Sequence, residues 1–102
     1  MIVARDITIG TITVSPQARN ACVAGHEVVL TTREFALLYH LMSRAGRIVS
    51  REELAEEVWG DPDSLLSNTI DVNVCHLRAK IGDDDRTIIR SIRGVGYFYA
   101  IK

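Results

Sequence analysis

Hydrophobic residues recur at helical spacing in the second half of the chain. Between residues 68 and 81, aliphatic side chains occupy positions i, i+4, i+7 and i+11, namely Ile70, Val74, Leu77 and Ile81. These positions fall on one narrow stripe, which predicts an amphipathic helix. The other face mixes amide, imidazole, cationic and small apolar groups: Val72, Asn73, Cys75, His76, Arg78, Ala79 and Lys80. Asn, His and Arg can bond base edges and Val can contact thymine methyl groups, so this face suits the DNA major groove.

Short β-branched segments alternate with turn residues over the first thirty positions. The segments are 2–4, 7–9, 11–14, 22–23 and 27–30, separated by Gly10, Ser15-Pro16, Arg19-Asn20 and Gly25. Such close spacing of β-branched runs and turn signals predicts an antiparallel meander of three or four strands.

A capping box marks the start of a first helix. Thr31 is followed three places later by Glu34, so each side chain can bond the backbone N–H group of the other. The helix is expected to end at Ala45-Gly46. Its apolar stripe comprises Phe35, Leu38, Leu41 and Met42.

Ser50 and Glu53 form a second capping box. It predicts a helix that stops at Gly60-Asp61-Pro62 and has Leu54, Val58 and Trp59 on its inner side. The segment 47–49 before it is too short for more than a strand stub, and residues 63–67 are expected to form a loop.

The chain ends in two strand-like runs, 87–92 and 97–101, joined by Arg93-Gly94-Val95-Gly96. Two glycines in four residues predict a tight hairpin. The order of strands, three helices and hairpin predicts one α+β domain over residues 1–102. We expect this domain to be a winged helix-turn-helix with an N-terminal antiparallel sheet, three helices and a C-terminal β-hairpin wing.

Charge is distributed unevenly along the chain. The 102 residues are 47% hydrophobic and 25% charged, with a net charge of −1. Residues 1–66 hold six arginines and nine acids, a net −3, whereas residues 67–102 hold six cations and four acids, a net +2. Three of those four acids form the run 83–85, expected to be a solvated turn, so the other cations can form a basic face for a phosphate backbone.

Membrane, secreted and enzymatic classes receive no support. No apolar run approaches the roughly 18 residues of a membrane span, and the first residues lack a signal-peptide layout. Two cysteines make no disulfide framework, so a reducing cytoplasm is the expected location. The three histidines lie apart from any catalytic motif. Cys75 and His76 point about 100° apart on a helix and have no partner ligands, so no metal, cofactor or catalytic residue is expected.

Several phrases, in order and at matching spacing, resemble one family. They are LTTREFALL (30–38), GRIVSREEL (46–54), VWG (58–60), NTIDV (68–72), LRAKIG (77–82) and IRSIRGVGY (89–97). Together they resemble the output domain of the OmpR/PhoB class of two-component response regulators, over residues 30–97.

The resemblance implies sequence-specific binding of double-stranded DNA, usually on direct repeats, with helix 68–81 in the major groove. Its candidate contacts on that helix are Val72, Asn73, His76 and Arg78, with Asn68 and Thr69 at the helix start. Arg51 and the Trp59 indole N–H match phosphate-contacting positions. Wing 93–96 would place Arg93 in the minor groove, with Ser91, Gly94 and Tyr97 at the backbone. The loop 60–66 matches a segment that many members offer to RNA polymerase, and a receiver domain would precede residue 1.

Alternatives stay open for several of these residues. Arg78 could pair with Asp71 or with an acid of the 83–85 run, and Arg93 could be a solvated hairpin tip. Asn68 or Ser67 could act as an N-cap that includes Asp71. Asn68, His76 and Ala79 stand where family members often carry arginine or lysine, and Cys75 is unusual for the family, so a modest intrinsic affinity is expected. The same domain also resembles those of one-component and pathway-specific activators, and a protein-binding module could use Val72, Cys75 and Ala79.

Overall fold

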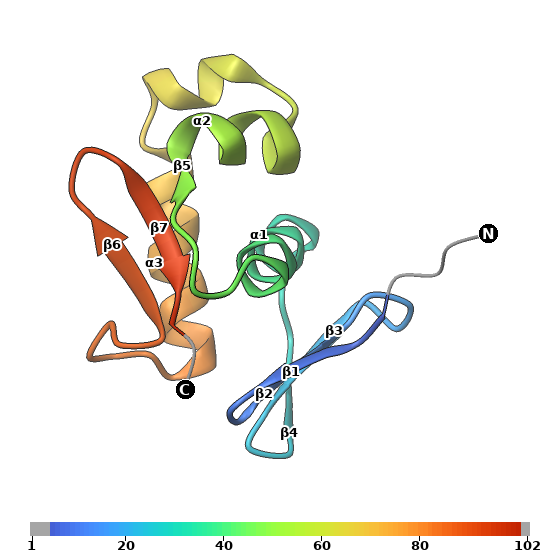
Figure 1. Cartoon of the computed structure of the whole chain (residues 1–102). Helices are drawn as coiled ribbons and strands as arrows, with labels where there is room; N and C mark the ends of the chain where they lie inside the picture. Colours follow the sequence, from blue (N-terminus) through green and yellow to red (C-terminus); the bar gives the residue numbers. More distant parts are fainter. Residues whose placement is uncertain (1–4, 101–102) are drawn as a thin grey trace.

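The computed structural model describes residues 5–100. Its first unit is a four-stranded antiparallel sheet of order β1-β2-β3-β4, as the alternating segments predict. The strands are β1 (Ile7–Ile9), β2 (Ile12–Ser15), β3 (Asn20–Val23) and β4 (His26–Val28). The predicted segment 2–4 lies outside the described residues. Figure 1 shows this sheet on one side of helix α1, with the remaining helices and the second sheet on the other.

Helix α1 spans Thr32–Ser43 and begins with the predicted capping box. The Glu34 N–H donates to the Thr31 hydroxyl at 3.1 Å, and the Thr31 N–H donates to the Glu34 carboxylate at 2.9 Å. Leu38, Leu41 and Met42 are buried as expected, whereas Phe35 is only half-buried.

The second predicted helix is present but changes geometry along its length. Helix α2 (Arg51–Leu54) continues directly as the π-helical segment η1 (Ala55–Trp59), which ends at Gly60 with φ +64°. The Ser50 hydroxyl accepts from the Glu53 N–H at 3.0 Å. The Glu53 carboxylate does not complete the capping box; it instead accepts from His40 Nε2 at 2.7 Å, which ties α2 to α1.

The predicted loop over 63–67 is wrong, because Pro62–Leu66 forms a 3₁₀ helix, η2. Proline suits the first position of a helix, where no N–H donor is needed, and the Asp61 carboxylate caps the segment by accepting from the Asp63 N–H at 3.0 Å. Helix α3 (Thr69–Ile81) follows and ends at Gly82 with φ +77°. All four residues of its aliphatic stripe are buried.

The predicted hairpin belongs to a three-stranded sheet of order β5-β7-β6. Its strands are β5 (Val49–Ser50), β6 (Ile89–Ile92) and β7 (Gly96–Tyr99). The strand stub before α2 therefore gains a partner, since Val49 pairs with Tyr97 and Ser50 with Gly96. This pairing holds the start of α2 beside the wing.

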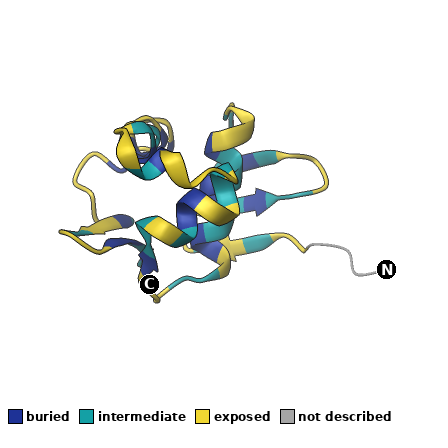
Figure 2. Ribbon diagram, turned by 90° about the horizontal axis from the view of Figure 1, so that it is seen from above, coloured by how far each residue is buried: buried dark blue, intermediate teal, exposed yellow. Residues whose placement is uncertain are grey.

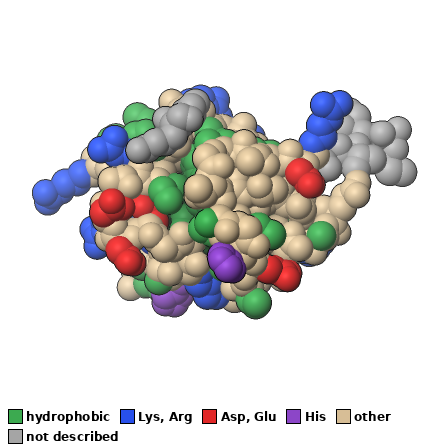
Figure 3. All heavy atoms as spheres, turned by 90° about the horizontal axis from the view of Figure 1, so that it is seen from below, with side chains coloured by type: hydrophobic (Ala, Val, Ile, Leu, Met, Phe, Trp, Pro, Cys, Tyr) green, Lys and Arg blue, Asp and Glu red, His purple; other side chains and the backbone are tan. Residues whose placement is uncertain are grey.

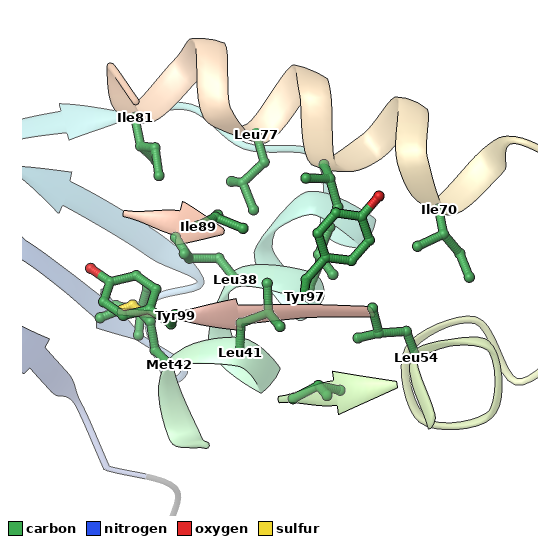
Figure 4. Packing of buried hydrophobic residues seen from close by; sticks show 14 of the residues in the cluster. Leu38, Leu41, Met42, Leu54, Ile70, Leu77, Ile81, Ile89, Tyr97 and Tyr99 are labelled. Carbon is green, nitrogen blue, oxygen red and sulfur yellow. The ribbon is translucent and has the colours of Figure 1, made fainter. Parts of the chain in front are cut away.

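One hydrophobic core joins the three helices and β7. Figure 4 shows Leu77 and Ile81 of α3 pointing towards β7 and α1, and Ile70 pointing towards Leu54 of α2. Seen from above in Figure 2, buried positions lie where the elements face one another, and exposed positions lie on outer helix faces and hairpin loops. None of the helices between residues 5 and 100 has the length and apolar character that crossing a membrane requires.

The acidic run 83–85 was expected to be a solvated turn, but its first residue, Asp83, is buried. The residue is 1% exposed. Its carboxylate accepts from the N–H groups of Thr87 and Ile88 at 2.9 Å each, and from that of Ile89 at 2.8 Å. Asp84, by contrast, is exposed. Asp83 therefore fastens the end of α3 to the start of β6.

Glu34 couples the start of α1 to the end of α3. Its side chain is 4% exposed and pairs with Lys80 Nζ at 2.6 Å. Burial favours the protonated acid, but hydrogen bonds from Lys80 and from the Thr31 backbone outweigh burial and hold the pKa of Glu34 below its ordinary value of 4.5. Because the pKa is lower in the folded state, ionised Glu34 stabilises the fold above pH 4.5, and this contribution disappears as the pH falls through the folded value.

Glu34→Gln is therefore expected to lower stability at neutral pH by about 1–2 kcal/mol and to flatten the decline of Tm on acidification. Thermal melts from neutral pH to below 4.5 measure both effects. The matched control is Glu56→Gln, which changes an exposed carboxylate that has no ion-pair partner among residues 5–100. A pH dependence of Tm that is the same in wild type and Glu34→Gln would contradict the assignment.

Candidate nucleic-acid interface

The outward side of α3 carries Val72, Cys75, His76 and Ala79, without a lysine or arginine among them. Val72 is 37% exposed, and Cys75, His76 and Ala79 are also exposed. The helical stripe predicts this side correctly, since these residues lie roughly opposite Ile70 and its buried neighbours. The side chains present a branched apolar group, a thiol, an imidazole and a methyl group, a surface suited to base edges and thymine methyl groups more than to phosphates.

Of the two expected caps at the start of α3, Ser67 makes the capping bond, and Asp71 takes no part in it. Asn68 holds the N-cap position and is exposed, but its side chain makes no capping hydrogen bond. Ser67 takes that role, because its hydroxyl accepts from the Thr69 N–H at 3.3 Å. The Asn73 amide donates to the Thr69 carbonyl at 2.9 Å. The Asn68 side chain is thus not bonded within the helix, whereas the Asn73 side chain is half-buried and bonded to it.

The structure corrects the predicted position of Arg78, which does not lie on the outer face of α3. It is 7% exposed, and its Nε and Nη2 donate to the Ile89 carbonyl at 3.0 and 2.7 Å. Nη2 also donates to the Ser91 hydroxyl at 2.8 Å. At about 100° per residue, position 78 lies only about 70° from the middle of the buried stripe. The helical angle, more than the residue type, is the sequence signal that predicts this placement.

Asp71 joins three elements instead of capping α3. Its Oδ1 accepts from Arg51 Nη1, at the start of α2, and from the Tyr97 hydroxyl of β7. Burial would raise the pKa of Asp71, but the bonds from Tyr97 and Arg51 hold it below the ordinary value. Burial and the neighbouring Asp71 raise the pKa of Tyr97 to about 12, so its hydroxyl remains a donor at neutral pH.

Tyr97 and Ser91 were expected at the DNA backbone, and the structure gives both an internal role. Tyr97 is 8% exposed, and its single O–H proton is directed to Asp71. A phosphate offers only acceptor oxygens, so Tyr97 would have to release Asp71 in order to bind one. Ser91 is exposed, but its hydroxyl accepts from Arg78.

The wing tip lies beside the start of α3. Arg93, Gly94 and Val95 are exposed in the loop between β6 and β7, which closes through a Val95 N–H to Ile92 carbonyl bond at 3.0 Å. A hollow of about 170 Å³ lies at this point, lined by Arg51, Asp71, Ser91, Ile92, Arg93, Gly94, Gly96 and Tyr97. Arg93 forms no ion pair with any residue of the described range 5–100.

Trp59 ends η1 and is half-buried. The Arg33 guanidinium carbon lies 5.6 Å from its ring centroid, and Arg33 Nη1 donates to the Val58 carbonyl at 2.6 Å. Arg33 is exposed, so this pair places a positive charge over an indole at the far end of the second helix.

Sequence reasoning missed Arg90 as a candidate contact. It is exposed on β6, next to buried Ile89, and makes no ion pair within the described part of the chain. The alternation of in and out positions along a strand is the signal that identifies it. Arg90 and Arg93 thus place two unpaired cations on the wing. On the face seen in Figure 3, opposite α2 and the wing loop, basic side chains are spread around the edge with acidic ones between them.

Residues 5–100 contain no cluster of three or more His, Cys, Asp or Glu side chains that could hold a metal ion. Both cysteines are free thiols, Cys22 half-buried and Cys75 exposed.

Solved structures with this fold include DNA-binding domains. The RstA domain of Klebsiella pneumoniae, crystallised in complex with the RstA box, matches with a TM-score of 0.87 and 29% identity, over 95% of this chain and 98% of that one. The DNA-binding domain of CpxR from E. coli matches with a TM-score of 0.87 and 31% identity, over 96% and 98%. DrrB of Thermotoga maritima, an OmpR/PhoB homologue, matches with a TM-score of 0.82 and 29% identity, over 94% and 44%.

Sequence relatives point the same way. Transcriptional regulatory protein QseB of Escherichia coli O157:H7 is 39% identical over 88 residues, which cover 86% of this chain and 39% of that protein. Response regulator protein PmrA of Pseudomonas aeruginosa is 36% identical over 88 residues, covering 86% and 38%. The chain thus spans about two fifths of the length of these relatives. The family described as "Transcriptional regulatory protein, C terminal" matches residues 25–99. The chain therefore belongs to this family of C-terminal regulatory domains, as a winged helix-turn-helix of the OmpR/PhoB response-regulator type.

Proposed function

We propose that this domain binds double-stranded DNA sequence-specifically as the output domain of a two-component transcriptional regulator. Helix α3 enters the major groove, and the wing reaches the adjacent minor groove. One observation carries the proposal: Arg51 at the start of α2, Asp71 in the first turn of α3 and Arg93 at the wing tip line one hollow. Figure 1 shows α2 and the wing loop at the same end of the molecule. A helix-turn-helix and a wing must meet in this way to contact neighbouring grooves.

The proposed DNA-contacting residues fall into two classes, those that read bases and those that contact phosphates. Val72, His76 and Asn68 are the proposed base-reading residues, because they are exposed and their side chains make no bonds within the helix, with Thr69 and Asn73 at the margin. Phosphates are contacted by the remaining donors of Arg51, the Trp59 indole N–H and the Gly94 backbone. Phosphate contacts set the register of the protein on the duplex, and base contacts select the sequence.

In vitro selection of duplexes from a random pool tests this function. We expect one enriched motif and a slope of log K against log salt of roughly −4 to −5, for about 4–6 neutralised phosphates. Failure to bind even random duplex at low salt would reject DNA binding. It would favour the alternative of a protein-interaction module that uses the exposed Val72, Cys75 and Ala79.

Arg93→Ala is expected to weaken binding to the selected duplex by about 1–3 kcal/mol, because the wing loses its minor-groove cation. Titration by fluorescence anisotropy measures the change. Arg19→Ala is the matched control: it removes the same charge from an exposed turn between β2 and β3, away from the wing. Equal affinity losses in the two variants would indicate a general charge effect and remove Arg93 from the site.

We also propose a contact with RNA polymerase and the binding of two copies of the domain to one DNA site. Residues 60–66 contact RNA polymerase, since Leu66 at the end of η2 is 87% exposed and offers an apolar anchor. Two domains bind side by side on direct repeats, because a single module with few cations on α3 binds weakly. A selected motif without a repeat would contradict the second proposal, and a Leu66→Ser variant with full transcription in a reconstituted assay would contradict the first.

A further inference from the structure

Two polar residues on one flank of α3 attach this helix to the wing. Asp71 and Arg78 are seven residues apart, or about two turns, so they project from the same side. Asp71 accepts from the Tyr97 hydroxyl of β7. Arg78 donates to the Ile89 carbonyl and to the Ser91 hydroxyl of β6. Each strand of the hairpin is thus bonded to a different turn of the same helix.

Tyr97 connects the two attachment points. Its hydroxyl reaches Asp71, and its ring centroid lies 5.8 Å from the Arg78 guanidinium carbon. Figure 4 shows the Tyr97 ring standing on β7 with its hydroxyl directed towards α3. We call Asp71, Arg78, Tyr97 and the Ser91 hydroxyl the helix–wing clamp.

We propose that Asp71 and Arg78 are positioning residues, which fix the wing at one orientation relative to α3 and thereby set the spacing of major- and minor-groove contacts. This inference rests on the proposed binding of DNA. The apolar contacts of Leu77 and Ile89 hold the two elements together, but they are non-directional. Hydrogen bonds are directional, and a planar guanidinium that meets a carbonyl and a hydroxyl allows little rotation of the hairpin.

The clamp makes Arg78 different from a phosphate-contacting arginine in two measurable respects. Removing a cation that contacts a phosphate reduces the magnitude of the slope of log K against log salt by about 0.9. Removing a buried positioning group leaves this slope nearly unchanged. A lysine preserves the charge of a phosphate contact but cannot reproduce the fork that holds Ile89 and Ser91.

The test compares Arg78→Lys and Arg78→Met with wild type in titrations of the selected duplex and of random duplex over a range of salt. Circular dichroism confirms folding, and Arg19→Met is the control for the loss of one charge. We expect both Arg78 variants to lose about tenfold in affinity for the selected duplex, with little change in random-duplex affinity or salt slope. A slope reduced in Arg78→Met and restored in Arg78→Lys would overturn the proposal, because it identifies a direct phosphate contact.

A double-mutant cycle tests the coupling to the wing even if Arg78→Met fails to fold. Tyr97→Phe removes only the hydroxyl that reaches Asp71 and keeps the ring against Arg78. We expect the penalty of Arg93→Ala to shrink at least threefold in the Tyr97→Phe background, since a misplaced wing has less contact to lose. Full additivity would overturn the proposal. Wild-type protein that binds no duplex would instead refute the proposed function, so the two failures are distinguishable.

Discussion

Asp83→Ala is expected to destabilise the domain by about 3–4 kcal/mol. Three backbone N–H groups, those of Thr87, Ile88 and Ile89, lose their acceptor in a site that is 1% exposed. Each hydrogen bond to a charged acceptor contributes roughly 1.5–3 kcal/mol, and three bonds to one carboxylate are not additive. Thermal unfolding should show a fall in Tm of roughly 12 °C or more.

The neighbouring Asp84 provides the control for Asp83. Asp84→Ala removes the same charge from the same turn, but Asp84 is exposed, so we expect a change within about 0.5 kcal/mol. Asp83→Asn keeps one carbonyl acceptor and should lie between the two. Similar Tm values for Asp83→Ala and Asp84→Ala would mean that the carboxylate does not hold β6 to α3.

Gly96→Ala should destabilise the domain by about 2–3 kcal/mol, because it forces two strands apart. A Cβ atom at this position would lie 2.0 Å from the Val49 carbonyl oxygen and 2.9 Å from Ser50 Cα. Both atoms are backbone and cannot turn away, so β5 must leave β7, and overpacking of this kind typically costs 1–3 kcal/mol or more. Because β5 leads directly into α2, the variant should also displace Arg51 and weaken DNA binding when measured at a temperature where it remains folded.

Gly94→Ala is the comparison for Gly96→Ala. Gly94 has φ +76° and no atom within 4 Å of its added Cβ, so the cost is backbone strain alone, about 1 kcal/mol. Chemical denaturation of the two variants separates these causes. A loss of stability at position 96 no greater than that at position 94 would show that β5 adapts to the extra methyl group.

Local patterns were sufficient to predict most elements of this fold. The Thr31–Glu34 box, the glycines that end η1 and α3, and the aliphatic stripe of α3 act over a few residues, so their structural consequences follow from nearby sequence. The prediction for 63–67 failed because a 3₁₀ segment capped by Asp61 carries no hydrophobic period. The π-helical continuation of α2 likewise has no sequence pattern that separates it from an ordinary helix.

The candidate site likewise contains residues whose positions follow from local sequence and residues whose partners do not. Periodicity predicted that Val72 and His76 lie opposite the core, and turn chemistry predicted an exposed Arg93, since each depends on local geometry alone. Local geometry could not predict the partners of Arg78, Asp71 and Tyr97, because these partners lie 11 to 26 residues away along the chain. Glu53 shows the same limit, since its carboxylate bonds His40 of α1 instead of its own cap.

The chain's residue order was thus enough to specify the winged helix-turn-helix, its family and the side of α3 that faces outward. Only tertiary packing decided which charged groups remain available on that surface. Arg78, Asp83 and Glu34 are all charged residues that composition assigns to solvent, yet folding buries them beside specific donors or acceptors. A charge moves from surface to interior when partners from distant segments replace its hydration, and those partners exist only once the elements have packed.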